Sequence, residues 1–151
     1  MKKKRKYFFI VCLSILSLAS FSQTEVDSLK KLLHNAIHDT IRLRLNVALS
    51  EVCDEQDILF YANPAVTLAD KLLQEENILK NSSLKSKILN QKSLALNNIG
   101  IVYRQNGNLP KALEYYELGL KIREEINDKK GISESLNNVA DIYNQQGNIP
   151  L

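Results

Sequence analysis

A fifteen-residue phrase occurs twice in this chain, 40 residues apart, and this internal repeat limits the possible folds more than any other feature. The copies read LNNIGIVYRQNGNLP from Leu96 and LNNVADIYNQQGNIP from Leu136. Eight of the fifteen aligned positions are identical, and three more exchange one aliphatic residue for another. A fixed period of this length is typical of arrays in which one supersecondary unit is copied and stacked.

The first copy has the spacing of a helix, a tight turn and a second helix. Small and apolar residues at i, i+3, i+4 and i+7 predict one helical face: Leu96, Ile99, Gly100 and Tyr103. Gly107 is expected to supply the positive φ of the turn, Asn108 to cap the next helix, and Pro110 to stand in its first turn. The second helix again places small and large residues on one face: Ala112, Leu113, Tyr116, Gly119 and Leu120.

The end of this second helix is predicted at the sequence NDKKG, residues 127–131. Lys129 and Lys130 would complement the negative end of the helix dipole, and Gly131 would stop the helix. The small residues would let the two helices approach closely, with tyrosines filling the gaps beside them. One such hairpin cannot bury its apolar face alone, so the copies are expected to stack.

The order of small and aromatic positions from Leu96 to Gly119 resembles the tetratricopeptide repeat, whose usual unit is about 34 residues. A longer second helix accounts for the period of 40 here, and the wording KALEYYELGLKIREE is similar to the subclass found in kinesin light chains and in exported bacterial sensor and scaffold proteins. The resemblance implies an all-α fold: a right-handed superhelical stack of antiparallel helix hairpins.

An earlier, degenerate copy precedes the clear one, because ILFYANPAVTL from Ile58 aligns with ALEYYELGLKI from Ala112. Pro64 lies inside its second helix and should kink it. The expected organisation is a signal peptide (1–22), an N-terminal cap helix (23–40), a degenerate repeat (41–80), a repeat with a long first helix (81–131) and the first helix of a truncated third repeat (132–151).

The first 22 residues have the pattern of a secretory signal peptide. Five basic residues within positions 2–6 precede an apolar run from Tyr7 to Phe21, and the small residues Ser20 and Ser22 favour cleavage after Ser22. The alternative is an uncleaved membrane anchor, for which the run is short. Either reading predicts export, to the periplasm or beyond the cell.

Export changes the meaning of the formal charge of +3. Of 20 basic residues, five belong to the signal, so 15 face 17 acidic residues in the mature chain, a net charge of about −2. A mildly acidic protein without a basic cluster is not expected to bind nucleic acid. Cys53 would be the single mature cysteine and is interpreted as a small buried hydrophobe.

The resemblance also places a ligand groove, which the first helix of each repeat would line. The candidate groove residues lie at matched positions of these helices: Asn46, Leu94, Asn97, Asn98, Ile101, Arg104, Asn137, Asn138, Asp141 and Asn144. Asparagine recurs at one matched place, at 46, 97 and 137. Because its amide both donates and accepts, such a ladder could hold the backbone of an extended peptide.

Two readings of these asparagines stay open. They could bind a peptide, or they could hydrogen-bond between neighbouring helices and face water. Asparagine is a poor residue within a helix, by about 0.5–0.7 kcal/mol relative to alanine, so its recurrence has some reason in either case.

Motifs of enzyme chemistry are not evident. His34 and His38 stand at i, i+4, but no third metal ligand is evident near them, so a solvent-facing helix is the favoured reading. There is no phosphate loop and no nucleophile motif. The sequence therefore predicts a non-enzymatic scaffold that needs no cofactor or small-molecule substrate and binds a protein or an extended peptide segment.

Two further expectations concern the C-terminal repeat. The resemblance to exported bacterial sensors offers an alternative function, a sensory segment whose membrane helix and kinase or DNA-binding output domain would follow this chain. The apolar stripe of the last helix, which includes Leu136 and Tyr143, would lack a partner helix. This segment is expected to be the least stable part or to self-associate.

Overall fold

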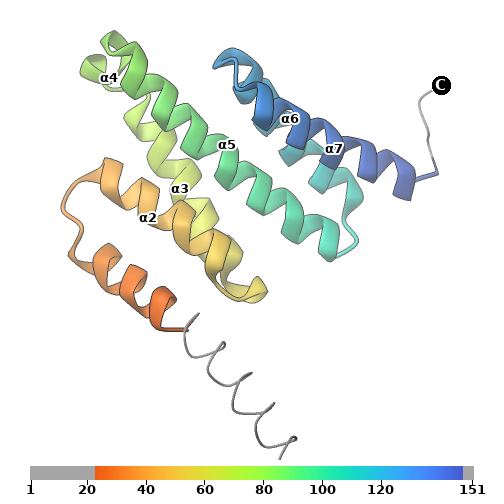
Figure 1. Cartoon of the computed structure of the whole chain (residues 1–151), viewed down its shortest axis with the longest axis horizontal. Helices are drawn as coiled ribbons and strands as arrows, with labels where there is room; N and C mark the ends of the chain where they lie inside the picture. Colours follow the sequence, from red (N-terminus) through yellow and green to blue (C-terminus); the bar gives the residue numbers. More distant parts are fainter. Residues whose placement is uncertain (1–22, 148–151) are drawn as a thin grey trace, which may run out of the picture.

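The computed structural model describes residues 23–147, and this part of the chain forms helices without a strand. The helices follow one another in chain order across the molecule, from the N-terminal helix to α7 at the opposite end (Figure 1). Separate apolar clusters lie along the stack instead of one central core. The predicted fold class, an all-α solenoid of helix hairpins, is confirmed.

The predicted signal peptide, residues 1–22, lies outside the described residues, as do residues 148–151. Among the helices of residues 23–147, none has both the length and the apolar character needed to cross a membrane.

The first hairpin consists of α2 (Asp39–Val52) and α3 (Ile58–Leu72), joined by the short 3-10 helix η1 (Glu55–Asp57). Branched residues of α2 meet small residues of α3 in its core: Leu43, Val47, Ala65 and Ala69. The helix α3 runs without interruption through Pro64, whose predicted kink stays a prediction. The degenerate copy therefore forms a hairpin despite its divergent sequence.

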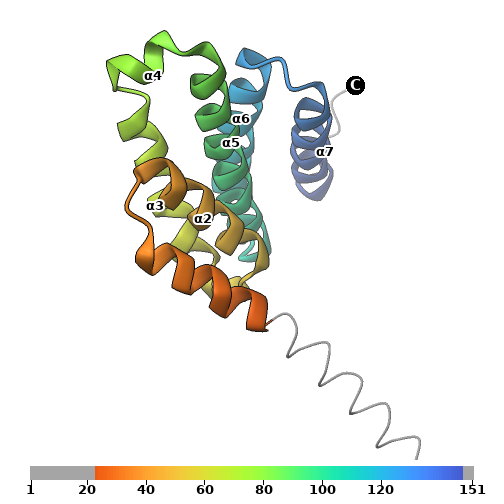
Figure 2. The ribbon, with the colours of Figure 1, turned by 60° about the vertical axis from the view of Figure 1, so that its left-hand side comes forward.

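An N-terminal helix over residues 23–35 covers the outer end of this hairpin (orange in Figure 2). Its stripe of Val26, Leu29 and Leu33 packs against Leu49 and Tyr61. The predicted cap helix is thus present, but it ends at residue 35 instead of 40, since residues 36–38 form the connection to α2.

A short helix that the sequence analysis did not predict, α4 (Glu76–Lys80), links the two hairpins. Ile78 anchors this link in the first core with 2% of its surface exposed. The side chain of Asn81 then accepts a hydrogen bond from the backbone N–H of Leu84 and caps the following helix.

The second hairpin consists of the long helix α5 (Ser82–Gln105) and α6 (Leu109–Glu125). The turn between them confirms the prediction: Gly107 has a φ of 73°, Asn108 caps α6, and Pro110 lies in its first turn. Tyr116 lies directly over Gly100, where a Cβ atom would come within 2.6 Å of the ring. The absence of a side chain at Gly100 therefore leaves the space that the ring of Tyr116 occupies.

The end of α6 differs from the prediction. α6 ends at Glu125, and α7 (Lys129–Gln145) already contains the two lysines and the glycine that were expected to end the previous helix. Asn127 adopts a left-handed φ of 57°, which turns the chain, and the side chain of Asp128 accepts a hydrogen bond from the N–H of Gly131. An asparagine turn followed by an aspartate cap thus replaces the expected glycine stop.

The last helix, α7, packs on the second hairpin with one face only. Ile142 is fully buried beside Ala112 and Tyr116, and Val139 packs against the same cluster. On the other face Leu136 is 50% exposed and Ala140 is also exposed. The matched residue Leu96, which α6 covers in the complete hairpin, is only 4% exposed.

Candidate binding surface

The helix α3 packs against both α2 and α5, and Figure 1 shows the three helices next to one another. Two hollows that share lining residues form one groove between α2 and α5. We call it the inner groove. Its α2 wall is Ile41, Arg44, Ala48 and Glu51, and its α5 wall is Leu84, Lys87, Gln91 and Leu94. In each wall the residues follow helical spacing, so each helix presents one stripe to the channel.

The inner groove consists of two hollows, with volumes of about 410 and 470 Å³. Ile41, Arg44 and Gln91 line both hollows, which makes the channel one surface instead of two separate pockets. Leu29 of the N-terminal helix lines the second hollow. Apolar side chains form much of the surface, and Ile41 is 45% exposed there. Such a surface favours a ligand that covers apolar area.

The two cations of the inner groove, Arg44 and Lys87, are both exposed and both line its first hollow. Within residues 23–147 neither side chain has an ion-pair or hydrogen-bond partner. Several other lysines and arginines of the described chain do pair with carboxylates, including Lys85 with Glu125 and Lys92 with Asp70 on the same helix. The groove therefore holds two cations that are free to meet a ligand.

The inner groove also carries a carboxylate, Glu51, which lines the second hollow together with Arg44. Partial burial raises the pKa of Glu51 above its usual value. No ion pair within the described residues compensates this carboxylate, and the side chain of Gln91 has no hydrogen-bond partner either. Both cations therefore line the first hollow and the carboxylate lines the second, while Arg44 and the free amide of Gln91 border both hollows.

The structure places several predicted groove residues in the interior. Asn46 is 6% exposed, and its amide donates to the backbone oxygen of Arg42. Asn98 is 9% exposed and donates to the hydroxyl of Ser50, 2.9 Å away. These two asparagines join or stabilise helices, as the second reading of the sequence proposed, and do not lie on an open groove.

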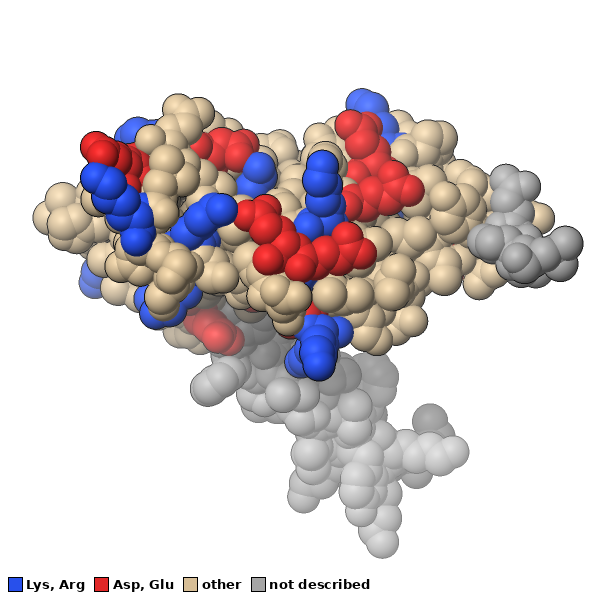
Figure 3. Space-filling model, turned by 90° about the horizontal axis from the view of Figure 1, so that it is seen from above, with Lys and Arg blue, Asp and Glu red and all other residues tan. Residues whose placement is uncertain are grey.

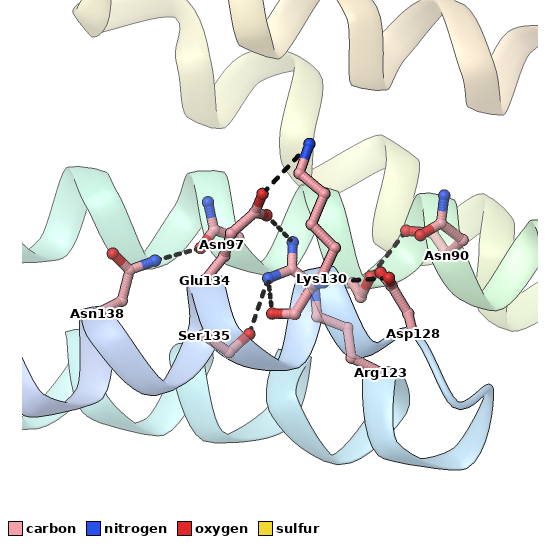
Figure 4. Close-up of polar contacts among 10 residues, drawn as sticks. Asn90, Asn97, Arg123, Asp128, Lys130, Glu134, Ser135 and Asn138 are labelled. Carbon is pink, nitrogen blue, oxygen red and sulfur yellow. Dashed lines mark hydrogen bonds and ion pairs between the residues drawn. The ribbon is translucent and has the colours of Figure 1, made fainter.

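Between α5 and α7 the predicted residues pair with one another. The amide of Asn138 donates to the side-chain oxygen of Asn97 at 2.7 Å, and Arg104 binds Asp141 at 2.5 Å. Figure 4 shows the first of these bridges. Both partially exposed pairs cross between repeats, so they fix the position of α7 relative to α5.

The remaining predicted residues have different surroundings. Leu94 lines the inner groove, while Ile101 packs against the C-terminal core. Asn137 and Asn144 are exposed on α7, without a side-chain partner in the described chain. A ligand role for Leu94, Asn137 and Asn144 stays a prediction. Of the three matched asparagines, Asn46 is buried, Asn97 is half-buried and Asn137 is exposed.

A buried arginine joins the two repeats at the base of α7 (Figure 4). Arg123 of α6 is 2% exposed and donates from Nη1 to the backbone oxygen of Gly131 and to the hydroxyl of Ser135. Glu134 lies 3.7 Å from Nη2 of the same side chain, and Lys130 shares this carboxylate. Arg123 therefore has a structural role at this junction.

His34 lies on the N-terminal helix and His38 in the connection to α2, so the two histidines do not share a helix. Among residues 23–147, no group of three histidine, cysteine, aspartate or glutamate side chains is placed to hold a metal ion. His34 instead lines a shallow hollow with Phe60 and Arg42. Cys53 is partly buried beside the N-terminal helix, and this burial raises the pKa of its thiol.

Most residues of the inner groove could not be predicted from the sequence. Arg44, Lys87 and Gln91 were not named, although Arg44 stands at i+3 from Ile41 and Gln91 at i+4 from Lys87. The sequence does contain one indication of the groove: the first helices of both hairpins, α2 and α5, each carry a stripe of apolar and charged residues. The face that such a stripe occupies depends on the helix rotation, which residue spacing alone does not give.

The fold is a helical repeat solenoid with an open groove between the first helices of its two hairpins. Residues 91–150 match the family model of the tetratricopeptide repeat. No curated protein and no solved structure matches the chain. This match begins within α5, at residue 91, and tetratricopeptide repeats generally bind proteins or peptides.

Proposed function

We propose that this protein is an exported binding scaffold whose inner groove holds an extended segment of a protein partner. The observation that carries the proposal is the continuity of the groove, whose hollows of about 410 and 470 Å³ share three lining residues. Side chains along it lack partners within residues 23–147, so they are available to a ligand. Seen from above in Figure 3, the surface carries both acidic and basic side chains. A surface of mixed charge favours a protein partner over nucleic acid.

The test of this proposal is peptide selection followed by mapping. Random peptides selected for binding to the purified protein would be titrated into labelled protein, and amide shifts would be followed. We expect the shifts to concentrate on α2 and the first half of α5. The variant Ala48→Trp, which fills the groove, should abolish binding, whereas Leu118→Trp on the exposed side of α6 should not. Shifts confined to α3 and α6 would contradict the proposal.

The asparagines of α5 and α7 provide a second test of how far the ligand extends. If the bound segment continues from the inner groove along α7, the double variant Asn97→Ala/Asn137→Ala should weaken binding while the helix content is unchanged. Binding at wild-type strength would remove the asparagine ladder from the proposal and leave the inner groove as the site.

Export rests on the first 22 residues, whose basic start and apolar run have the pattern of a cleaved signal. Expression of the whole chain in a bacterial host, followed by N-terminal sequencing of the exported product, tests it. A mature protein that begins at Gln23 is expected. Retention of the whole chain in the membrane would favour the uncleaved anchor instead.

A second candidate function is a sensory segment of a signal-transduction protein of the kinesin-light-chain-like subclass. The observation that favours it is the open face of α7, because a further helix of the same array would cover the exposed Leu136 and Ala140. Sequencing the transcript beyond the codon of Leu151 tests this candidate. More repeats, a membrane helix and an output domain would support it, and a stop codon there would exclude it.

The same open face supports a proposal of self-association through α7. Sedimentation equilibrium of the wild type should show a concentration-dependent dimer that the variant Leu136→Ser weakens. A monomer at all accessible concentrations would exclude self-association.

A further inference from the structure

The charges of the inner groove have a fixed order, and this order constrains the ligand. Lys87 lines only the hollow that contains Leu84, and Glu51 lines only the hollow that contains Leu94. Arg44 borders both hollows. None of these three side chains has an ion pair within residues 23–147. A ligand without matching charges would displace water from these three side chains without offering them an ion pair or a hydrogen bond, which costs binding free energy.

The separation of the opposite charges on α2 follows from the helix geometry. Arg44 and Glu51 are seven residues apart on α2, so their Cα atoms are separated by about 10 Å along the helix axis. A segment in the extended polyproline II conformation advances about 3.1 Å per residue and presents every third side chain on the same side, so about three residues span an equal distance. A ligand that meets both charges therefore carries its two charged residues about three positions apart.

The middle of the groove sets what lies between the charges. Between Arg44 and Glu51 on α2, Ala48 leaves room because its side chain is small, and Ile41 and Leu94 add apolar surface to the same hollow. The free amide of Gln91 can donate to and accept from the backbone of an extended segment, whose N–H and C=O groups have no internal partners. Apolar side chains of the ligand would therefore cover this surface while its main chain binds the amide.

We propose that the inner groove recognises an extended protein segment in which an acidic residue and a basic residue stand three positions apart with apolar residues between them. The acidic side chain pairs with Arg44 and Lys87, and the basic side chain pairs with Glu51. This inference rests on the proposed function of the groove as a peptide site and adds the chemistry of its partner.

The test uses capped, fluorescein-labelled dodecapeptides that differ only in a central tetrad, so that terminal charges do not contribute. The tetrads are Glu-Leu-Leu-Lys, Gln-Leu-Leu-Gln and Glu-Ser-Ser-Lys. Fluorescence anisotropy with the purified protein measures each Kd. We expect the first peptide to bind about tenfold more tightly than each of the others. A tenfold ratio corresponds to the loss of one charge-assisted hydrogen bond in the second peptide and to the loss of partly buried leucine surface in the third.

Matched variants separate the groove from general charge effects. Arg44→Ala/Lys87→Ala should weaken the first peptide about tenfold, while Lys121→Ala/Lys129→Ala, which removes the same charge from exposed positions on α6 and α7, should leave it unchanged. The variant Glu51→Lys should reverse the preference at its end of the groove and favour a Glu-Leu-Leu-Glu tetrad over Glu-Leu-Leu-Lys. Circular dichroism would confirm that each variant is folded.

Three results would overturn the inference, and they differ in what they mean for the proposed function. Equal binding of the Gln-Leu-Leu-Gln peptide, blocked by Ala48→Trp, would remove the charge pairing and keep the peptide groove. Equal loss of binding in the two double-alanine variants would show that only net charge matters. Failure of every peptide to bind, together with failure to select any groove-binding peptide, would overturn both proposals.

Discussion

Arg123 donates a hydrogen bond to the hydroxyl oxygen of Ser135 at 2.8 Å, and the same nitrogen donates to the backbone oxygen of Gly131 at 2.7 Å. The arginine belongs to the last turn of α6, and both acceptors belong to the first turns of α7. One buried side chain thereby holds the second hairpin to the helix that follows it.

Replacement of this arginine should loosen the C-terminal junction. In Arg123→Ala the two acceptors lose their donor inside the protein, so we expect the free energy of unfolding to fall by about 2–4 kcal/mol. Urea denaturation followed by circular dichroism measures it. Lys121→Ala, an exposed residue of the same helix, is the control and should change the free energy by less than about 0.5 kcal/mol. Equal effects of the two changes would contradict the role of Arg123.

The two glycines at the helix contact should respond to alanine with opposite signs. At Gly100 a Cβ atom would lie 2.6 Å from Tyr116, which is 1% exposed and has no room to move. We expect Gly100→Ala to destabilise the protein by about 1–3 kcal/mol. At Gly119 the nearest atom is the backbone oxygen of Ser93 at 3.4 Å, an ordinary contact, so Gly119→Ala should stabilise by about 0.5–1 kcal/mol. Thermal unfolding of both variants measures the difference in sign.

The buried pair of Asn98 and Ser50 should be energetically coupled. Its hydrogen bond of 2.9 Å connects α5 to α2 in the interior. A double-mutant cycle of Asn98→Ala and Ser50→Ala should give a coupling free energy of about 1 kcal/mol. Asn137→Ala serves as the control, because this exposed asparagine has no side-chain partner in the described chain. A coupling of zero would mean that the buried asparagine contributes only through packing.

The ion pair of Asp39 and Lys71 should be visible in the titration of Asp39. The hydrogen bond from Lys71, with Nζ 2.6 Å from Oδ2, is the main cause that lowers the pKa of Asp39, and Arg42 contributes least. The pair stabilises the fold above the pKa of the unfolded carboxyl group, and this contribution is lost as the pH falls through the lowered folded pKa. In Lys71→Ala the pKa should rise toward its usual value, and in Arg42→Ala it should rise less. Carboxyl-carbon NMR measures both, and equal rises would contradict this order.

The backbone of α7 should exchange its amide hydrogens faster than that of α5. Residues 136–143 lie on a helix with one open face, whereas residues 96–103 are covered by α6. Hydrogen exchange at the matched amides should show lower protection in α7 by at least tenfold. Equal protection in a monomeric sample would refute the expectation that the C-terminal segment is the least stable part.

The local features of the second hairpin could be predicted because each depends on a few adjacent residues. Gly107, Asn108 and Pro110 fix the turn and the start of α6 through their own backbone preferences. The predicted helix end at Gly131 was wrong, because Asn127 and Gly131 can both take a left-handed conformation. The aspartate cap decides between them by favouring a helix that begins at Lys129.

The candidate site could be predicted only in part. The resemblance to tetratricopeptide repeats placed Asn46, Asn98 and Leu94 on first helices, and the structure has them on α2 and α5. It did not distinguish the interior from the open face, and two of these residues are buried while the third lines the groove. A helical face spans several residues, and a small rotation of α2 against α5 exchanges a buried position for an exposed one.

The sequence by itself determined the repeating unit, its capped turns and the all-helical stack, because these follow from local backbone preference and from an apolar period that demands stacking. The tertiary structure decided which side chains remain without partners. Arg44, Lys87 and Glu51 are ordinary surface charges in the sequence, and they come to line one groove because α3 packs against both α2 and α5. That placement depends on packing between residues far apart in the chain, which no local pattern records.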